Sequence, residues 1–273
     1  MAATGIDSLR RFLDRHDRLF VLTGAGCSTD SGIPDYRDAD GEWRRTSRPV
    51  MFRDFMTDLG TRRRYWTRGL VGWEPLRRAA PNDAHRALAR LERAGRVELL
   101  VTQNVDRLHQ AAGSEAVVDL HGRADVVRCM SCELRMPRAE LQAELLRTNP
   151  TWSHLGAKAA PDGDADLDAA DYPSFVVPEC ADCGGVLKPD VVFFGESVPR
   201  ERVARSMQGL AAADAVLVIG SSLMVYSGYR FVRAAAELGK PIAAVNLGRT
   251  RADDVLTVKI AATCADALAA CVA

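Results

Sequence analysis

Four short apolar runs, each ending in small or polar residues, constrain the fold of this chain more than any other feature. The runs span residues 19–22, 97–101, 215–219 and 241–245. Helical patterns lie between them, at residues 83–94, 200–213 and 228–238. Strands that alternate with helices favour an α/β fold with a doubly wound parallel sheet. Because ligands bind beyond the carboxyl ends of such strands, we expect the four run ends to converge on one crevice.

Charge and hydropathy exclude several classes of partner. The 36 basic side chains balance the 36 acidic ones, so no net field favours nucleic acid or an anionic membrane. No apolar run approaches the roughly 20 residues that cross a bilayer. Residues 1–20 lack the apolar centre of a secretion signal. Residues 8–20 are typical of an amphipathic helix, with Leu9, Phe12, Leu13 and Leu19 on one face. We expect a cytoplasmic protein, and the preference for Arg and Ala suggests a bacterial source.

The turn after the first run has the composition of a phosphate-binding loop. Gly24 and Gly26 form a G-x-G sequence directly after the run. Glycines let the backbone approach a pyrophosphate, and free N–H groups at a helix start complement its charge. The third glycine of the dinucleotide fingerprint is missing because residue 29 is Thr, and a polar loop with Asp35 and Arg37 follows. The turn predicts a dinucleotide site unlike that of an ordinary dehydrogenase.

The other run ends carry polar groups that suit the rest of a dinucleotide. Gln103, Asn104 and Asp106 follow the second run, where they are placed to bind a ribose and a carboxamide; a plain helix N-cap is the alternative. Hydroxyl and amide groups follow the third and fourth runs and suit a second phosphate and the adenosine half. These are Ser221 and Ser222 after Gly220, and Asn246 before Leu247 and Gly248. Ordinary strand-to-helix turns are the alternative for both.

One histidine stands out as a candidate general base. His121 follows the apolar residues 117–120 and precedes Gly122, which leaves room beside it. An imidazole with a pKa near 6.5 suits proton abstraction at neutral pH. His109 lies on a predicted helix and is expected to be structural. No motif surrounds His16, His85 or His154.

Two Cys-x-x-Cys pairs predict a structural zinc site. Cys129 with Cys132, and Cys180 with Cys183, supply four thiolates, which close a tetrahedral Zn²⁺ site and leave no open position for catalysis. A redox dithiol is the alternative. Five aspartates and no base occupy residues 161–171, between the pairs. We expect a solvated loop there; a Ca²⁺ loop is the sharper alternative, but the Glu that ends an EF-hand loop is missing.

Taken in order, these motifs resemble those of the sirtuin, or Sir2-like, family. The resemblance covers nearly the whole chain and rests on residues 24–37, 102–106, 121–122, both cysteine pairs, residues 188–196 and 220–223, and Asn246. Residues 150–152, 161–164 and 226–231 are similar to those of the class II branch. The family implies a Rossmann-like NAD-binding domain from residues 1–122 and 188–273, with a helical and loop insertion at 38–80. It also implies a zinc-binding module at residues 123–187.

The resemblance further implies an NAD-dependent protein-lysine deacylase that transfers the acyl group to ADP-ribose and releases nicotinamide. NAD is a co-substrate, acyl-lysine proteins are the partners, and one Zn²⁺ is structural. Catalytic roles fall on His121, as the base that deprotonates a ribose hydroxyl, and on Asn104. The residues implied in NAD binding are Gly24, Ala25, Gly26, Ser28, Asp35, Tyr36, Arg37, Gln103, Asn104, Asp106, Gly220, Ser221, Ser222, Asn246, Leu247, Gly248 and Cys264.

The peptide substrate is expected to pair as a strand with residues 192–196. Its implied contacts are Val192, Phe193, Gly195, Glu196 and Val225. Tyr65 and Arg68 resemble the pair with which desuccinylating members bind an acidic acyl group, which predicts that glutaryl-type peptides react faster than acetyl peptides; a helix with Arg68 facing solvent is the alternative.

Two other functions use the same residues. One is a protein ADP-ribosyltransferase with the same NAD cleavage, and the other is a non-enzymatic NAD or ADP-ribose sensor, against which His121 argues. Cys27 departs from the family, in which an aliphatic residue is common at this position. Cysteine is small and apolar, so we expect it to be tolerated there.

Overall fold

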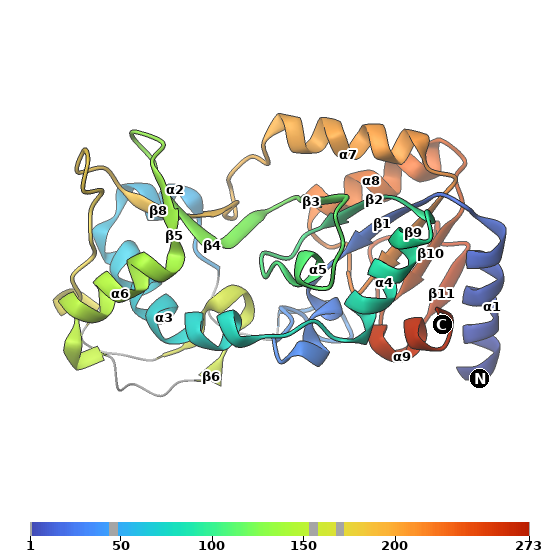
Figure 1. Cartoon of the computed structure of the whole chain (residues 1–273), viewed down its shortest axis with the longest axis horizontal. Helices are drawn as coiled ribbons and strands as arrows, with labels where there is room; N and C mark the ends of the chain where they lie inside the picture. The colour runs from blue at the N-terminus through green and yellow to red at the C-terminus, as the bar shows by residue number, and fades with distance from the viewer. Residues whose placement is uncertain (1, 44–48, 153–157, 168–171, 273) are drawn as a thin grey trace. The chain divides into compact units, whose positions relative to one another are not determined.

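The computed structural model describes residues 2–43, 49–152, 158–167 and 172–272 (Figure 1). The chain divides into two compact units. The first consists of Met1–Thr46, Ala80–Leu120 and Val198–Ala273, and the second of Ser47–Ala79 and His121–Ser197. Each unit is therefore built from chain segments that are far apart in the sequence. The sequence suggested residues 38–80 as an insertion in the dinucleotide domain, whereas most of that segment belongs to the second unit.

A six-stranded sheet with neighbours paired in parallel forms the centre of the first unit, which confirms the predicted fold class. Its strands, in spatial order, are β11 (Val258–Ile260), β10 (Ile242–Val245), β9 (Ala215–Ile219), β1 (Leu19–Thr23), β2 (Val97–Thr102) and β3 (Val117–Asp119). The chain proceeds from β1 toward β3 on one side and from β9 toward β11 on the other. The order therefore reverses between β1 and β9, and this switch point is where doubly wound folds bind ligands.

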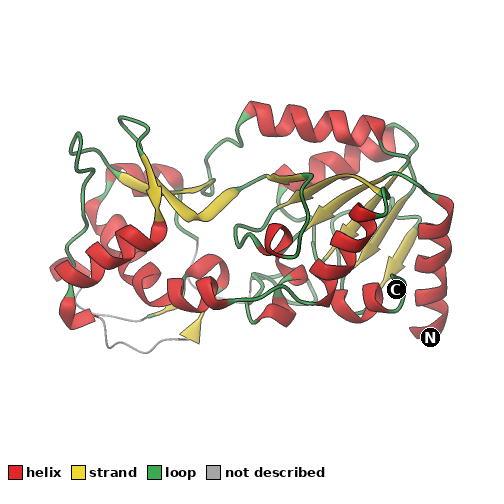
Figure 2. Cartoon of the chain, in the orientation of Figure 1, coloured by secondary structure: helices red, strands yellow, loops and turns green. Residues whose placement is uncertain are grey.

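Helices cover both faces of this sheet, as Figures 1 and 2 show. On one face lie α1 (Ala2–Arg15), α4 (Asp83–Arg93) and α9 (Cys264–Ala269). On the other lie α7 (Arg200–Ala212) and α8 (Tyr226–Glu237). Side chains of β1 alternate between the two layers, since Leu19 and Val21 pack with the first set of helices and Phe20 and Leu22 with the second. Both faces are thus apolar, which explains why the strands appear in the sequence as continuous apolar runs.

The predicted elements agree with the structure within two residues, except at the N-terminus. The expected helix at residues 8–20 is wrong in both bounds, because α1 starts at Ala2 and ends at Arg15. Leu19 shares the buried layer of Leu9, Phe12 and Leu13, but it does so from β1 and not from the helix. Leu19 therefore matched the apolar spacing of the helix face although it belongs to the strand.

The second unit contains a small antiparallel sheet and a helical part. The sheet has the order β5 (Arg135–Pro137), β4 (Gly122–Cys129) and β8 (Leu187–Val191). The helices are α2 (Phe52–Thr57), α3 (Leu59–Arg78) and α6 (Arg138–Thr148). Asp58 caps α3 by accepting a hydrogen bond from the Thr61 amide at 2.6 Å. Aromatic side chains, Phe55 and Trp66 among them, pack with the sheet in one apolar cluster.

The acidic segment of the second unit is packed, so the expectation of a solvated loop is wrong for its first half. Pro161 and Ala165 are buried. A Cβ at Gly72 of α3 would lie 2.3 Å from the Asp164 carbonyl oxygen, so the two backbones are in direct contact. Asp168 and Asp171 lie outside the described residues. Within the described ranges, no aspartate of this segment belongs to a group that could hold a metal ion. No helix in those ranges is long and apolar enough to cross a membrane.

Candidate functional site

The turns after β1 and β9 interlock at the switch point of the sheet. The Gly26 amide donates to the Gly220 carbonyl oxygen at 2.9 Å, and the Gly24 amide donates to the Ile219 carbonyl oxygen at 3.1 Å. A Cβ at Gly24 or Gly26 would lie about 3 Å from Gly220 atoms, and one at Gly220 would lie 2.2 Å from the Cys27 nitrogen. Gly220 also has a φ of +62°, which L residues rarely adopt. These glycines therefore allow two turns of the protein to meet, in addition to the phosphate contact that their spacing predicts.

The amides of the first turn are largely used inside the protein. Besides Gly24 and Gly26, Cys27 donates to the Gly24 carbonyl oxygen at 2.9 Å and Ser28 donates to that of Ala25 at 3.0 Å. The expectation that these N–H groups are free to bind a phosphate is wrong for the four residues. Any phosphate contact at this turn must come from other groups.

Ser28 is the centre of a buried polar cluster, which we call the Ser28 cluster. Its hydroxyl donates to Asp106 Oδ2 at 2.7 Å and accepts from Asn104 Nδ2 at 3.0 Å. The same Asn104 amide donates to the Gly24 carbonyl oxygen at 3.1 Å. Asp106 Oδ1 accepts from the amide of Leu108, the first residue of α5 (Leu108–Ala111), but the N-cap of this helix is Arg107, so neither Asn104 nor Asp106 occupies the N-cap position that the alternative expected. The cluster holds Asn104 and Asp106 at the end of β2, and burial raises the pKa of Asp106.

His85, which no sequence motif surrounds, is the fourth member of the Ser28 cluster. The Asn82 amide donates to its Nδ1 at 3.3 Å. Neutral His85 therefore carries its proton on Nε2, which lies 3.4 Å from Ser28 Oγ. Asn82 also caps α4 and donates from Nδ2 to the Cys27 carbonyl oxygen at 2.8 Å. The Asn-x-x-His spacing at the start of α4 was the available signal, because both side chains of a capping box must face the helix start.

Gln103 and Ser221 connect the ends of β2 and β9. Ser221 Oγ donates to Gln103 Oε1 at 2.6 Å. A Cβ at Gly228 of α8 would lie 2.6 Å from Gln103 Nε2, so this glycine makes room for the side chain. Ser222 accepts from the Arg251 amide through its carbonyl oxygen. The structure thus brings three of the four run ends together.

The fourth run end meets the loop that follows the first turn. Asn246 donates from Nδ2 to the Gly248 carbonyl oxygen, and a Cβ at Gly248 would lie 2.4 Å from the Ala39 carbonyl oxygen. Leu247 between them is 66% exposed. Cys264 begins α9 and is buried beside Gly220, where burial raises the pKa of its thiol to about 12.

The loop with Asp35, Tyr36 and Arg37 is held by its own side chains. Arg37 donates from Nη1 to the Gly41 carbonyl oxygen at 2.7 Å, and its guanidinium lies 4.1 Å from the centre of the Trp43 ring. Tyr36 meets the same ring edge-on, and Asp35 is half-buried. These contacts order the loop next to the switch point.

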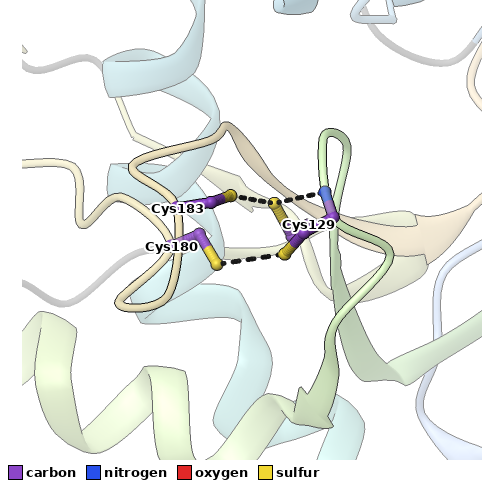
Figure 3. A group of neighbouring side chains, drawn as sticks. Cys129, Cys180 and Cys183 are labelled. Carbon is purple, nitrogen blue, oxygen red and sulfur yellow. Dashed lines mark hydrogen bonds between the residues drawn. The ribbon is translucent and has the colours of Figure 1, made fainter.

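In the second unit, the four predicted metal ligands lie together, and Figure 3 labels three of them, Cys129, Cys180 and Cys183. Cys129 Sγ lies 3.5 Å from Cys183 Sγ, and Cys132 Sγ lies 3.7 Å from Cys180 Sγ. The Cys132 and Ser131 amides point at Cys129 Sγ and lower the pKa of this thiol to about 6. Four sulfurs at these separations fit tetrahedral zinc. The redox alternative does not explain why both pairs meet in one group.

His121 and the predicted peptide segment are joined through β4 and β8. The Val192 amide donates to the His121 carbonyl oxygen at 2.8 Å. A Cβ at Gly122 would lie 2.0 Å from the Asp190 carbonyl oxygen, so the room that Gly122 leaves is filled by the β8 backbone.

The Glu196 side chain turns back into the predicted peptide segment. Its Oε2 accepts from the Phe193 amide at 2.9 Å and pairs with the buried Lys188 Nζ at 3.1 Å. Gly195 has a φ of +81°. Val225 belongs to the first unit, where it precedes α8.

Tyr65 and Arg68 are both partnered inside the second unit. Arg68 is 9% exposed, donates from Nε to the Ala165 carbonyl oxygen at 3.0 Å and pairs with Asp164 Oδ2 at 2.5 Å. The alternative in which Arg68 faces solvent is therefore wrong. Tyr65 packs against Phe55 and Phe193, and burial raises the pKa of its hydroxyl.

Comparison with known proteins identifies the family. A model described as the Sir2 family matches residues 24–227. The chain is 67% identical over 262 residues to an NAD-dependent protein deacetylase of Xanthomonas campestris pv. campestris (strain 8004), covering 96% of this chain and 89% of the relative. It is 46% identical to the NAD-dependent protein deacylase Sirt4 of Drosophila melanogaster, over 96% of this chain and 85% of the relative.

A solved structure described as "Sir2-p53 peptide-NAD+" is similar with a TM-score of 0.79 and 30% identity, over 97% of this chain and 95% of that one. The family model alone spans most of the chain. The protein therefore belongs to the Sir2 family.

Proposed function

We propose that this chain is an NAD-dependent protein deacetylase that transfers the acetyl group of an acetylated lysine to ADP-ribose and releases nicotinamide. The Ser28 cluster supports this function best, because it fixes an amide and a carboxylate at the switch point where dinucleotides bind. The 67% identity to a named deacetylase supports the same reaction. An enzyme that cleaves the nicotinamide bond must stabilise positive charge on the ribose, and groups oriented in advance do this without reorganisation.

Different residues of the chain bind NAD, act as the base and position other groups in this proposal. Asn104 and Asp106 orient the nicotinamide ribose and carboxamide, while Gln103 and Ser221 border the same pocket. The acyl oxygen attacks the ribose as nicotinamide leaves, and His121 then takes a proton from a ribose hydroxyl. Ser28 acts as a positioning residue, because its hydroxyl is already shared by Asn104, Asp106 and His85. Because the amides of residues 24 and 26–28 are used inside the protein, we assign the phosphates to side chains of the following loop, Arg37 among them.

Residues 192–196 bind the peptide as an added strand in this proposal. The Lys188–Glu196 ion pair and the bond from the Phe193 amide to Glu196 set the shape of the segment. Glu196 is thus a positioning residue, while the main chain of the segment pairs with the substrate. The four cysteines hold one structural zinc ion.

The deciding experiment incubates the protein with NAD and an acetyl-lysine peptide and follows nicotinamide, free lysine peptide and acetyl-ADP-ribose by mass spectrometry. All three are expected in equal amounts. His121→Ala should still bind NAD in a calorimetric titration but should lose turnover by at least ~100-fold, because general-base catalysis contributes about 10²–10⁴. ADP-ribose attached to a protein without acetyl-ADP-ribose would show an ADP-ribosyltransferase. NAD binding without any product would show a sensor.

The Arg68–Asp164 ion pair bears on the acyl group. An acidic acyl chain must compete with Asp164, whose carboxylate already pairs with Nη2 of the Arg68 guanidinium. We therefore propose that the enzyme prefers neutral acyl groups, in contrast to the preference that the Tyr65 and Arg68 spacing predicted. Asp164→Asn should raise the kcat/KM ratio of glutaryl to acetyl peptides, and Arg68→Met should not. Faster glutaryl than acetyl turnover by the unchanged protein would contradict this preference.

We also propose a branch of the family and a cellular compartment. The 46% identity to Sirt4 supports membership of the class II branch. Bacterial relatives at 61–67% identity support a bacterial source. Four cysteines grouped for zinc need a reducing compartment, so we propose the cytoplasm.

A further inference from the structure

Next to the Ser28 cluster, three side chains of the kinds that can bind a metal ion lie close together in the first unit. Cys27 comes from the turn after β1, His85 from the start of α4 and His109 from α5. All three are buried, and their ligand atoms lie within 4.8 Å of one another. We call them the Cys27 group. Neither the NAD chemistry nor the structural zinc site uses these three side chains as ligands.

The hydrogen-bonding capacity of the Cys27 group is only partly used. His109 bonds Thr23 Oγ1 through Nε2 at 2.9 Å, but its Nδ1 is buried and meets no partner among the residues that the structure describes. His85 Nε2 bonds Ser28 Oγ at 3.4 Å and lies 4.0 Å from Cys27 Sγ, and both distances are at the long end for a hydrogen bond. Most buried polar side-chain atoms have a partner, so an unused one calls for an explanation.

The donor set and its size fit a borderline-soft cation. Two imidazole nitrogens and one thiolate are ligands that zinc takes readily. A point equidistant from three atoms 4.8 Å apart lies about 2.8 Å from each, against ~2.3 Å for Zn–S and ~2.0 Å for Zn–N bonds. The side chains would move inward by less than about 1 Å. Burial lowers the pKa of both histidines, which keeps the rings neutral, and raises the pKa of the Cys27 thiol, so the ion must displace the thiol proton when it binds.

We propose that the Cys27 group is a second, weaker zinc site. On binding, the Cys27 thiol loses its proton to solvent and Sγ, His85 Nε2 and one His109 nitrogen form the three protein bonds to the ion. The Nε2 proton of His85 moves to Nδ1, which then can no longer accept from the Asn82 amide. This loss leaves a buried N–H without its acceptor and makes the site weaker than the four-cysteine site.

Occupation of this site would inhibit the proposed deacetylase. Zinc takes His85 Nε2 away from Ser28, whose hydroxyl orients Asn104 and Asp106. The bound ion would therefore disturb the nicotinamide side of the NAD site without blocking it. This consequence rests on the proposed function, whereas the binding of the ion does not.

The test measures zinc per chain. The protein is equilibrated with micromolar Zn²⁺, passed through a desalting column and analysed by inductively coupled plasma mass spectrometry for zinc and sulfur. We expect two zinc ions per chain, of which a mild chelator removes one. Cys27→Ala and Cys27→Ser should hold one, and Cys271→Ala, a cysteine outside both groups, should hold two. Circular dichroism checks that each variant is folded.

One zinc ion per chain in the unchanged protein would overturn the proposal, as would a second ion that persists in both Cys27 variants. A zinc ion bound only at the protein surface would persist in both Cys27 variants in this way. The activity arm is separate: the second ion should lower acetyl-peptide turnover at least several-fold, reversibly, and the Cys27 variants should resist. Binding of the second ion by a protein without any deacetylase activity would leave the site intact and reject only the proposed function.

Discussion

The Ser28 cluster and the four-cysteine group differ in how their polar atoms are partnered before a ligand binds. The Ser28 hydroxyl uses its donor and both acceptor sites within the protein, through Asp106, Asn104 and His85. The four sulfurs are close to one another and Cys129 receives two amide bonds, but all four can be thiolates at these separations only when a cation joins them. The first site is therefore complete before its ligand arrives, whereas the second needs its ligand to be stable. This difference sets the expected order of the following effects.

Removal of zinc should have the largest effect and should separate the two regions. Structural zinc supplies roughly 10–16 kcal/mol in zinc-finger peptides. After treatment with a strong chelator, we expect amides of β4 and β5 to exchange with deuterium rapidly, while amides of β1 and β9 stay protected. Hydrogen-exchange mass spectrometry measures both in one sample. Unchanged protection of β4 would show that the second unit does not depend on the ion.

Gly220→Ala tests whether the glycines at the switch point serve packing. A Cβ there would lie 2.2 Å from the Cys27 nitrogen and would require a φ of +62°. The combined cost of the left-handed backbone and the overpacking is roughly 2–5 kcal/mol in the free energy of unfolding.

Gly239→Ala is the matched control, because its φ is +67° and nothing lies within 4 Å of the new Cβ. It should lose only ~1–2 kcal/mol. Equal losses in urea denaturation would refute the packing role.

The buried histidine of the Ser28 cluster predicts a pH dependence. Burial and the neighbouring Arg86 lower the pKa of His85 from 6.5 to about 4. The unfolded chain therefore binds more protons between pH 6.5 and 4, so stability falls as the pH falls through this window, by up to about 3 kcal/mol. His85→Gln should flatten the curve of unfolding free energy against pH in this window. An unchanged slope would show that folding does not lower the pKa of His85.

Ser28→Ala should have the smallest effect on stability and a clear effect on turnover. It leaves the Asn104 amide and the Asp106 carboxylate without their shared partner, which costs about 1–3 kcal/mol. We expect kcat to fall by ~10-fold or more, with less change in the KM for the peptide. Thr29→Ala removes an exposed neighbouring hydroxyl and is the control. Similar kinetics for the two variants would show that the Ser28 hydroxyl does not orient Asn104 and Asp106 for catalysis.

The sequence predicted the sheet well because both faces of its strands are buried. Continuous apolar runs such as 215–219 have sharp ends, and β9 begins and ends at those residues. Helix α1 was misplaced because Leu19 joins the same layer from a strand. The partners of Ser28 and Arg68 were not predicted for another reason: His85 and Asp164 are 57 and 96 residues away from them. A pattern of neighbouring residues cannot predict contacts between residues so far apart in the sequence.

The pairing of β1 with β9 has a consequence for synthesis on the ribosome. Leu19 pairs with Ala215 in the central part of the sheet. At the usual ~5–20 residues per second, β1 leaves the ribosome roughly 10–40 s before this neighbour exists. Until then its edge is open, apolar on both faces, and able to pair with another nascent chain. The sheet of the first unit can be completed only when nearly the whole protein has been translated. Cells that make the protein must therefore protect β1 from aggregation during most of its synthesis.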